Sequence, residues 1–211
     1  MTNFNNPNEP PKEQLCFTYD EFKKFISIEE DIRWVCIFEI LYYCGLRRGE
    51  LRGLQWKDID LEKRTLSVSK QITDRNGSIK NTQFSLPKTR GSIRTLKMPQ
   101  KLTDDLLKYK NELQQFSLFN DDYFVAGDML PICSNTLTEH KNQNCKLAGV
   151  KQIRIHDFRH SCASLLINKG ANIQVVAKYL GHTKIEETLK TYAHLFLSSL
   201  DEIVDVIDSL D

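Results

Sequence analysis

The sequence predicts an α+β fold, mainly α-helical, with one small three-stranded antiparallel sheet. Helix caps and apolar runs mark helices along most of the chain. Short alternating segments surround Asn76-Gly77, a dipeptide typical of β-hairpin turns. No internal repeat or linker divides residues 18–211, and a chain of 211 residues suits one domain with a sizeable core.

The first helices follow from their capping residues. Thr18 and Glu21 form a capping box that starts a helix over residues 18–26. Residues 29–44 indicate a long, largely apolar helix that Gly45 ends. The segment "GELRGLQW" (49–56) indicates a further short helix.

Three segments predict the sheet: "TLSVSKQI" (65–72), "SIKNTQFSL" (78–86) and "SIRTLKM" (92–98). We expect them to form one three-stranded ribbon. After it, Pro99 starts a helix that runs to about residue 117. The remaining helices are expected over 135–148, 156–168, 173–180, 185–192 and 198–210, with glycines at 170 and 181 as stops.

Charge is unevenly distributed along the chain, although the net charge is only +1. Basic residues exceed acidic ones by 8 in residues 41–100 and by 6 in residues 141–194, and the other segments are acidic. If folding brings the two basic segments together, they form one positive surface suited to nucleic acid. Otherwise they are ordinary solvated charge.

The six cysteines are scattered and form no CxxC pair. Most lie in apolar segments, which indicates small buried hydrophobes in a reducing cytoplasm rather than zinc ligands or disulfides. No apolar segment is long enough to span a membrane. Residues 1–14 are polar and rich in proline and asparagine, which indicates a disordered lead-in rather than a signal peptide.

Two segments of the sequence carry charged or titratable residues at positions where folding alone does not require them. In "RIHDFRHSCASLL" (154–166), His156, Arg159 and His160 share one side of an otherwise apolar helix, and burying unpaired charge is costly. A lone histidine there is more often structural than catalytic. Arg47 lies at a break between two helices, where its partner is either Glu50 or a phosphate.

A tyrosine follows further along the chain. His182 comes directly after Gly181, and Tyr192 lies ten residues beyond His182. A tyrosine at helical spacing is usually a core residue, but the polar neighbours Thr191 and His194 leave a reactive hydroxyl open as an alternative.

Three motifs together resemble the tyrosine recombinase (phage integrase) family, in order and spacing: "CGLRRGELRGL" (44–54), "HDFRH" (156–160) and "YLGHTKIEETLKTYAHL" (179–195). The similarity covers residues 15–200, and "PKTRGSIRTLKM" (87–98) resembles conjugative-transposon and temperate-phage integrases. The resemblance implies the fold of a tyrosine recombinase catalytic domain. It also implies catalytic roles for Arg47, Lys88, His156, Arg159, His182 and Tyr192, and accessory roles for Glu50 and His160. Ser161 stands where the family usually has threonine.

The implied reaction cleaves and rejoins DNA with chemistry like that of type IB topoisomerases. The Tyr192 hydroxyl attacks a phosphodiester and forms a 3′-phosphotyrosine, while Arg47 and Arg159 bind the nonbridging oxygens. His156 accepts or returns the tyrosine proton, His182 donates a further hydrogen bond, and Lys88 protonates the leaving 5′-oxygen. The bond energy is retained, so religation needs no ATP, which fits a sequence without a GxxxxGK[ST] loop. Two arginines and a lysine supply the positive charge that a metal ion would otherwise provide, so no cofactor or metal ion is implied.

On the same grounds, we expect residues 15–197 to be the catalytic domain, with the family's N-terminal core-binding domain absent from this chain. The tail 198–211 carries an apolar stripe opposite acidic residues, formed by Leu200, Ile203, Val204, Ile207 and Leu210. The stripe packs either on its own domain or, as the resemblance implies, on a neighbouring protomer. The implied partner is double-stranded DNA, bound as a homotetramer by a protein that is monomeric in isolation. The implied setting is the bacterial cytoplasm and a mobile genetic element.

Two other functions stay open. One is a catalytically inactive DNA-binding fragment of a decayed integrase. The other is a metallohydrolase that uses His156, His160 and Cys162, but no ligand spacing elsewhere in the sequence supports it, so we expect no metal site.

Overall fold

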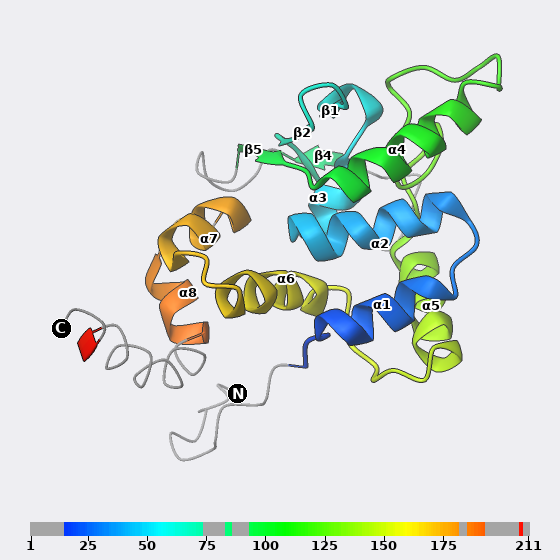
Figure 1. Cartoon of the computed structure of the whole chain (residues 1–211). Helices are drawn as coiled ribbons and strands as arrows, with labels where there is room; N and C mark the ends of the chain where they lie inside the picture. Colours follow the sequence, from blue (N-terminus) through cyan, green and yellow to red (C-terminus); the bar gives the residue numbers. More distant parts are fainter. Residues whose placement is uncertain (1–14, 74–82, 86–92, 182–184, 193–206, 209–211) are drawn as a thin grey trace, which may run out of the picture.

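The fold is organised around two helices that pack against each other, α2 (Ile32–Cys44) and α6 (Asp157–Asn168). The computed structural model describes residues 15–73, 83–85, 93–181, 185–192 and 207–208. In Figure 1, α2 lies between α6 and α4 (Gln100–Leu113). At one end α1 (Tyr19–Ser27) contacts α5 (Ser134–Leu147), and at the other α7 (Ile173–Leu180) contacts both α6 and α8 (Ile185–Tyr192).

The helix boundaries follow the predicted caps closely. The capping box of Thr18 and Glu21 is formed, and Gly45 ends α2 in the left-handed conformation. α2 begins at Ile32 rather than at residue 29, because the Asp31 side chain accepts a hydrogen bond from the backbone N–H of Arg33 and caps the helix. The predicted helix after Pro99 ends at Leu113, and turns follow it up to residue 118.

The predicted short helix over 49–56 is present as two elements. These are α3 (Arg48–Gly53) and a single 3₁₀ turn, η1 (Trp56–Asp58). The predicted helices over 135–148, 156–168, 173–180 and 185–192 correspond to α5, α6, α7 and α8 within one residue at each end.

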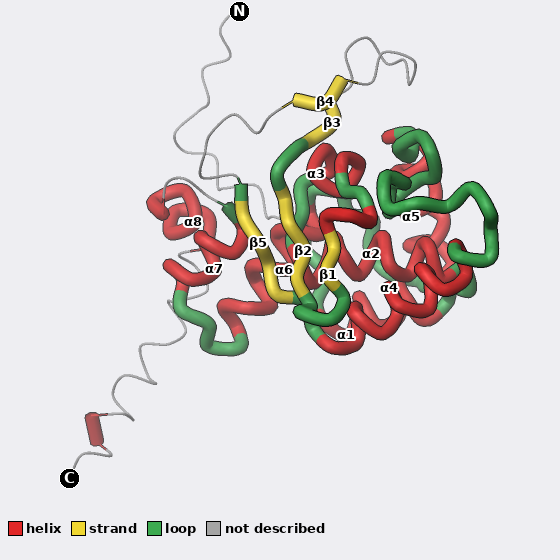
Figure 2. The backbone as a smooth tube through the Cα atoms, turned by 90° about the horizontal axis from the view of Figure 1, so that it is seen from above, coloured by secondary structure: helices red, strands yellow, loops and turns green. Residues whose placement is uncertain are grey.

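The three-stranded antiparallel sheet is present, and two of its strands lie within the predicted segments 65–72 and 92–98, but its third strand is residues 59–60 rather than the predicted 78–86. Its order is β1 (Ile59–Asp60), β2 (Thr65–Val68) and β5 (Arg94–Lys97), with Leu66 opposite both Ile59 and Leu96. The predicted strand 65–72 is broken after Val68. β3 (Gln71–Thr73) instead pairs with β4 (Gln83–Ser85) in a separate two-stranded sheet, which extends beyond the first one in Figure 2.

The break in the strand coincides with an ion pair. Lys70 lies between β2 and β3, and its ammonium contacts Asp58 at 2.7 Å and the side-chain oxygen of Gln55 at 2.7 Å. These contacts tie the chain to the segment after α3 and redirect it, so β3 packs against α3 instead of continuing β2.

Aromatic side chains anchor α6 in the core. Phe158 contacts Phe17, Phe25 and Phe38 with ring centroids 5.6 to 5.8 Å apart, and all four residues are buried. Such packing holds the backbone on either side of Phe158 in one place. The polar residues that flank Phe158 in the sequence are therefore carried by a rigid support.

All six cysteines are free, and four are buried, as expected for small core residues. None of the helices in the described residues has the length and apolar composition needed to cross a membrane. Several predicted features fall outside the described residues: the lead-in 1–14, the Asn76-Gly77 turn, Lys88, His182, and the tail apart from Ile207 and Asp208.

Candidate active site

Arg47 is held at the turn between α2 and α3. It occupies the N-cap position of α3 with an extended backbone, just after the left-handed Gly45. Glu50 accepts hydrogen bonds from the backbone N–H of Arg47 at 2.9 Å and from its Nη1 at 2.8 Å. The Arg47 side chain is still 34% exposed, so it faces both Glu50 and solvent.

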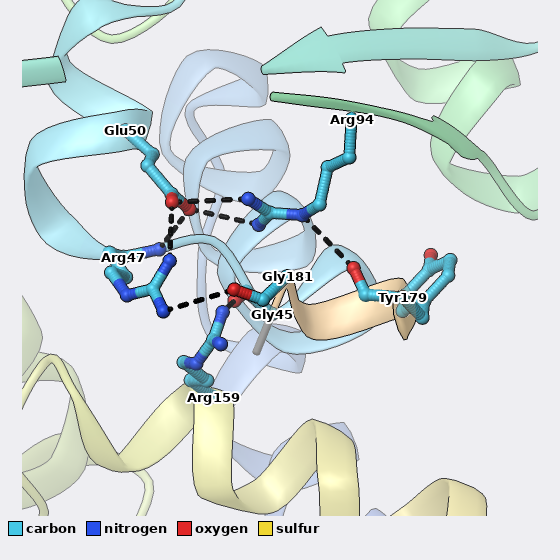
Figure 3. A network of polar contacts seen from close by, with 7 residues as sticks. All are labelled: Gly45, Arg47, Glu50, Arg94, Arg159, Tyr179 and Gly181. Carbon is cyan, nitrogen blue, oxygen red and sulfur yellow. Dashed lines mark hydrogen bonds and ion pairs between the residues drawn. The ribbon is translucent and has the colours of Figure 1, made fainter. Parts of the chain in front are cut away.

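Arg94 of β5 holds the other side of Glu50. Its Nη1 and Nη2 donate to Oε1 and Oε2 of Glu50 at 3.1 and 2.9 Å, as Figure 3 shows. Burial raises the pKa of Glu50, but the charges and hydrogen bonds of Arg94 and Arg47 outweigh it and hold that pKa below its usual range. Glu50 is thus a buried carboxylate shared by two arginines.

The start of α6 is fixed by side-chain contacts at its first turns. Asp157 accepts hydrogen bonds from the backbone N–H of Arg154 at 2.7 Å and from its Nη2 at 2.8 Å. Burial raises the pKa of Asp157, but these bonds lower it overall. The Ser161 hydroxyl donates to the Asp157 carbonyl and accepts from the backbone N–H of Phe17, both at 2.8 Å. The hydroxyl at position 161 therefore ties α6 to the segment that precedes α1.

Arg159 is a buried positive charge on α6. Only 2% of the residue is exposed, and its Nη1 donates to the Gly45 carbonyl at 2.8 Å. Its Nη2 is inaccessible to solvent and has no hydrogen-bond partner among the described residues. Burial and the charge of Arg47 lower the pKa of Arg159 to about 9, so the guanidinium is protonated at neutral pH. A buried donor without an acceptor is costly, and a phosphate oxygen is the kind of acceptor that suits it.

Tyr192 is the last residue of α8, and its side chain is buried. Its hydroxyl oxygen lies 2.8 Å from Nδ1 of His160. The rings of His160 and His156 are in edge-to-face contact, with centroids 5.0 Å apart. His156 precedes α6 at its N-cap position rather than lying within the helix. Among the described residues, His160 is the histidine within hydrogen-bonding distance of Tyr192.

The electrostatics keep these three side chains uncharged at neutral pH. Burial raises the pKa of Tyr192, and the charge of Arg159 opposes that rise. Burial and the adjacent His156 lower the pKa of His160 to about 4. Burial and Arg159 likewise lower the pKa of His156. The two neutral imidazoles can each accept a proton, whereas Tyr192 holds one that it can donate.

A basic cleft of about 840 Å³ opens beside Arg47 and His156. Residues 47–73 line one side and residues 138–156 the other, and the described lining contains no aspartate or glutamate. Its cationic members are Arg47, Arg48, Arg52, Lys141 and Arg154. The two basic segments therefore do meet along one cleft, as a positive surface would require.

Six of the eight predicted site residues lie in the described part of the chain, and they gather in two contacting sets. One contains Arg47 and Glu50, with Arg159 joined to it through the Gly45 carbonyl. The other contains His156, His160 and Tyr192. Lys88 and His182 lie outside the described residues, although Gly181, which precedes His182, has its carbonyl 3.5 Å from Nη2 of Arg47.

Sequence reasoning missed Arg94. The signal that could have found it is the alternation of β5, since period two places Arg94 on the same face as the buried Leu96. An arginine on the inward face of a strand needs a buried partner, and Glu50 is that partner.

The metal-site alternative gains no support. The described residues contain no cluster of three His, Cys, Asp or Glu side chains that could hold a metal ion. Cys162, one of the ligands considered, is buried with its Sγ 3.4 Å from the Tyr43 carbonyl.

Comparison with known proteins identifies the family. The model of the phage integrase family matches residues 16–198, so the chain belongs to this family. Among curated relatives, the ICEBs1 integrase of Bacillus subtilis is 32% identical over 201 residues, which cover 90% of this chain and 53% of the relative. The XerC-like tyrosine recombinase of Caldanaerobacter subterraneus is 31% identical over 210 residues, covering 92% and 54%. This chain therefore spans about half the length of these relatives.

Solved structures agree on the fold. The Tn1549 transposon integrase in complex with circular-intermediate DNA superposes with a TM-score of 0.73 at 25% identity, covering 99% of this chain and 68% of that one. The XerA recombinase superposes with a TM-score of 0.71, also at 25% identity, covering 94% and 65%. The described fold is that of a tyrosine recombinase catalytic domain.

Proposed function

We propose that this chain is the catalytic domain of a site-specific DNA recombinase or integrase, which cleaves and rejoins double-stranded DNA through a 3′-phosphotyrosine intermediate. The observation that carries the proposal is the set of groups around α6. A tyrosine hydroxyl is hydrogen-bonded to a neutral histidine, and a neighbouring buried guanidinium has one nitrogen without a partner among the described residues. The adjoining cleft is basic, and a phosphodiester of DNA supplies the anion that this arrangement needs.

In the proposed reaction, the Tyr192 oxygen forms a bond to the scissile phosphorus while the bond from phosphorus to the 5′-oxygen breaks. The tyrosine proton passes to an imidazole on α6, and His160 is the one already in hydrogen-bonding distance. Arg47 and Arg159 stabilise the charge that accumulates on the nonbridging oxygens. The reverse of these steps, with a 5′-hydroxyl of another strand as the nucleophile, rejoins the DNA.

Two further roles rest on the family resemblance. Lys88 protonates the departing 5′-oxygen, and His182 donates a hydrogen bond to the phosphate. The position of Gly181 beside Arg47 supports the second assignment, because His182 is the next residue along the chain. The complete set of functional residue types favours an active enzyme over the DNA-binding fragment of a decayed integrase.

We also propose that protomers associate on DNA through the tail 198–211. Ile207, a member of the predicted stripe, is 58% exposed. Its side chain is therefore an apolar surface that a partner protomer can bury. A groove of about 350 Å³ between the start of α4, α6 and α7 offers a complementary apolar surface on a second protomer, with Leu165, Val175 and Tyr179 among its lining.

The proposed function is tested with a nicked suicide substrate, in which the released strand diffuses away and the covalent intermediate accumulates. We expect the wild-type chain to give a protein–DNA adduct on a denaturing gel, and Tyr192→Phe to give none while still binding DNA. Tyr109→Phe is the matched control, because Tyr109 is also buried and its hydroxyl has no partner among the described residues. An adduct that survives in Tyr192→Phe contradicts the proposal.

A further inference from the structure

Arg94 has contacts that go beyond those of an ordinary strand residue. All three of its guanidinium nitrogens donate hydrogen bonds: two go to the Glu50 carboxylate and the third, Nε, goes to the Tyr179 carbonyl at 3.0 Å. Its side chain is only 6% exposed. Arg94 therefore faces other protein groups, and it connects β5 both to α3 and to the end of α7.

The charge of Arg94 decides what Arg47 can offer to a phosphate. Glu50 carries one negative charge and contacts both arginines. With Arg47 alone, the pair would be neutral. With Arg94 added, the three side chains carry a net positive charge, which is available at the exposed member, Arg47.

The geometry of Arg94 also decides where Arg47 points. Arg94 binds both oxygens of Glu50 in the two-pronged arrangement that fixes a carboxylate in one orientation. Those same two oxygens accept from Nη1 and from the backbone N–H of Arg47. Because Arg94 fixes the orientation of the Glu50 carboxylate, Glu50 in turn fixes the orientation of the Arg47 guanidinium.

A second contact extends this arrangement to the turn after α7. A Cβ atom placed on Gly181 would lie 3.0 Å from Cδ and Nη1 of Arg94, so the guanidinium lies directly against this glycine. The Gly181 carbonyl in turn approaches Nη2 of Arg47 at 3.5 Å. Arg94 and Arg47 thus both lie against the turn that leads to His182.

We propose that Arg94 is a positioning residue for phosphate binding by Arg47: it neutralises and orients Glu50, so that Arg47 keeps both its direction and an uncompensated positive charge. The inference rests on the proposed recombinase function only for its consequence on the reaction rate. The effect on Arg47 itself is a property of the folded chain with no DNA bound.

The first test replaces Arg94 by lysine in the full chain. Lysine keeps the charge, but its single nitrogen cannot bind both carboxylate oxygens and the Tyr179 carbonyl at once. We expect the single-turnover rate of adduct formation on saturating nicked DNA to fall about 10- to 100-fold, part of what loss of a transition-state donor costs. DNA affinity should stay close to that of wild type. Arg64→Lys is the matched control, because Arg64 lies on the same sheet's β1–β2 turn and is exposed, and its side chain hydrogen-bonds to Gln100.

A double-mutant cycle separates positioning from general damage. If Arg94 acts through Arg47, then Arg47→Ala/Arg94→Lys forms adduct no more than about threefold slower than Arg47→Ala, since two changes in one network are not additive. A double variant that is slower by the product of the two single effects contradicts the proposal. So does an Arg94→Lys variant with the wild-type rate.

A measurement without DNA keeps the inference distinct from the proposed function. The ¹⁵Nε signal of Arg47 is assigned by its loss in Arg47→Lys, and its heteronuclear NOE is compared in the wild type, Arg94→Lys and Arg64→Lys below their melting temperatures. We expect the Arg47 Nε to become mobile in Arg94→Lys alone. If the wild type forms no adduct but this change occurs, the proposed function fails and the positioning role stands. If the Arg47 signal is unchanged in Arg94→Lys, the positioning role fails whatever the adduct assay gives.

Discussion

Arg159 is a charged residue that is almost completely buried. Only one of its two terminal nitrogens has a hydrogen-bond partner among the described residues. Burying a charge without full compensation is destabilising. Phe158 and the bonds of Ser161 hold the helix around Arg159 in place regardless. The stability that these neighbours supply maintains a guanidinium with one nitrogen that has no hydrogen-bond partner among the described residues.

His156 and His160 differ in their distance from the Tyr192 hydroxyl, and a pH experiment can detect the difference. Without its base, the tyrosine must ionise unaided, and the tyrosinate fraction rises about tenfold per pH unit below the tyrosine pKa. We therefore expect His160→Ala to form adduct at least about a hundredfold more slowly than wild type at pH 7. The deficit should shrink steadily up to about pH 9.5 as hydroxide replaces the base.

His156→Ala is the control for that experiment. Because its imidazole is not within hydrogen-bonding distance of Tyr192, its deficit should change little over the same pH range. Wild-type His160 has its pKa lowered to about 4 and is already in its basic form across this range, so it adds no pH dependence of its own. If His156→Ala shows the pH rescue and His160→Ala does not, His156 is the proton acceptor that the family resemblance implies.

The motifs of the sequence selected most of the candidate site residues that the fold brings together, but they did not select Arg94. Motif order was enough to select Arg47, Arg159 and Tyr192. Arg94 lies 44 positions from Glu50 in the chain, and no local sequence pattern predicts a contact over that separation. Its inward-facing position on β5 is a hint that a buried partner exists, but not which one.

Among the elements, the turn that ends α2 bears most directly on the site. Gly45 has φ of 60°, and a Cβ there would lie 2.5 Å from Cδ2 of Leu180 and 3.3 Å from Sγ of Cys162. Its carbonyl also binds Arg159. A side chain at this position therefore strains the backbone and forces the Leu180 side chain of α7 to move.

We expect Gly45→Ala to lower the free energy of unfolding by about 2–4 kcal/mol, which combines left-handed strain with the overlap. Gly170→Ala is the control, because Gly170 has φ of 80° but no atom within 4 Å of the added Cβ. It should cost only about 1 kcal/mol, the backbone strain alone. Urea denaturation measures both, and equal losses for the two variants would contradict the packing described around Gly45.

Helices were predictable here and strand pairing was not. Capping residues and glycine stops are local, so Thr18, Asp31 and Gly45 specify helix ends from their own neighbours. β1 has two residues, too few to show a period, and its pairing with β2 is set by the turn between them. The division of 65–72 between two sheets depends on Lys70 meeting Asp58, a contact that alternation within the strand cannot reveal.

At the scale of the whole molecule, the small net charge conceals an uneven distribution of charge. The total of +1 would argue against a nucleic-acid partner, yet residues from both basic segments line one cleft without an acidic side chain among its described residues. What matters for DNA is the local field rather than the sum. The alternation of basic and acidic segments in the sequence gave the signal, and the fold determined that the basic ones meet.

The tail gives a prediction at the same scale. If residues 198–211 dock on a neighbouring protomer, then their deletion removes an intermolecular contact and leaves the domain's own core intact. We expect the truncated chain to melt close to the full chain but to lose self-association on DNA in sedimentation. A large drop in melting temperature with unchanged association would show that the stripe packs on its own domain.

In the proposed reaction, the Tyr192 oxygen becomes bonded to the 3′ end of a cleaved strand. The most direct measurement is a peptide map of the adduct trapped on a nicked substrate, in which mass spectrometry locates the modified residue and the attached nucleotide. We predict one modified peptide, with a 3′-linked phosphonucleotide on Tyr192 and a free 5′-hydroxyl on the released strand. A phosphonucleotide on another residue, or a link to the 5′ end of the DNA, would contradict the mechanism.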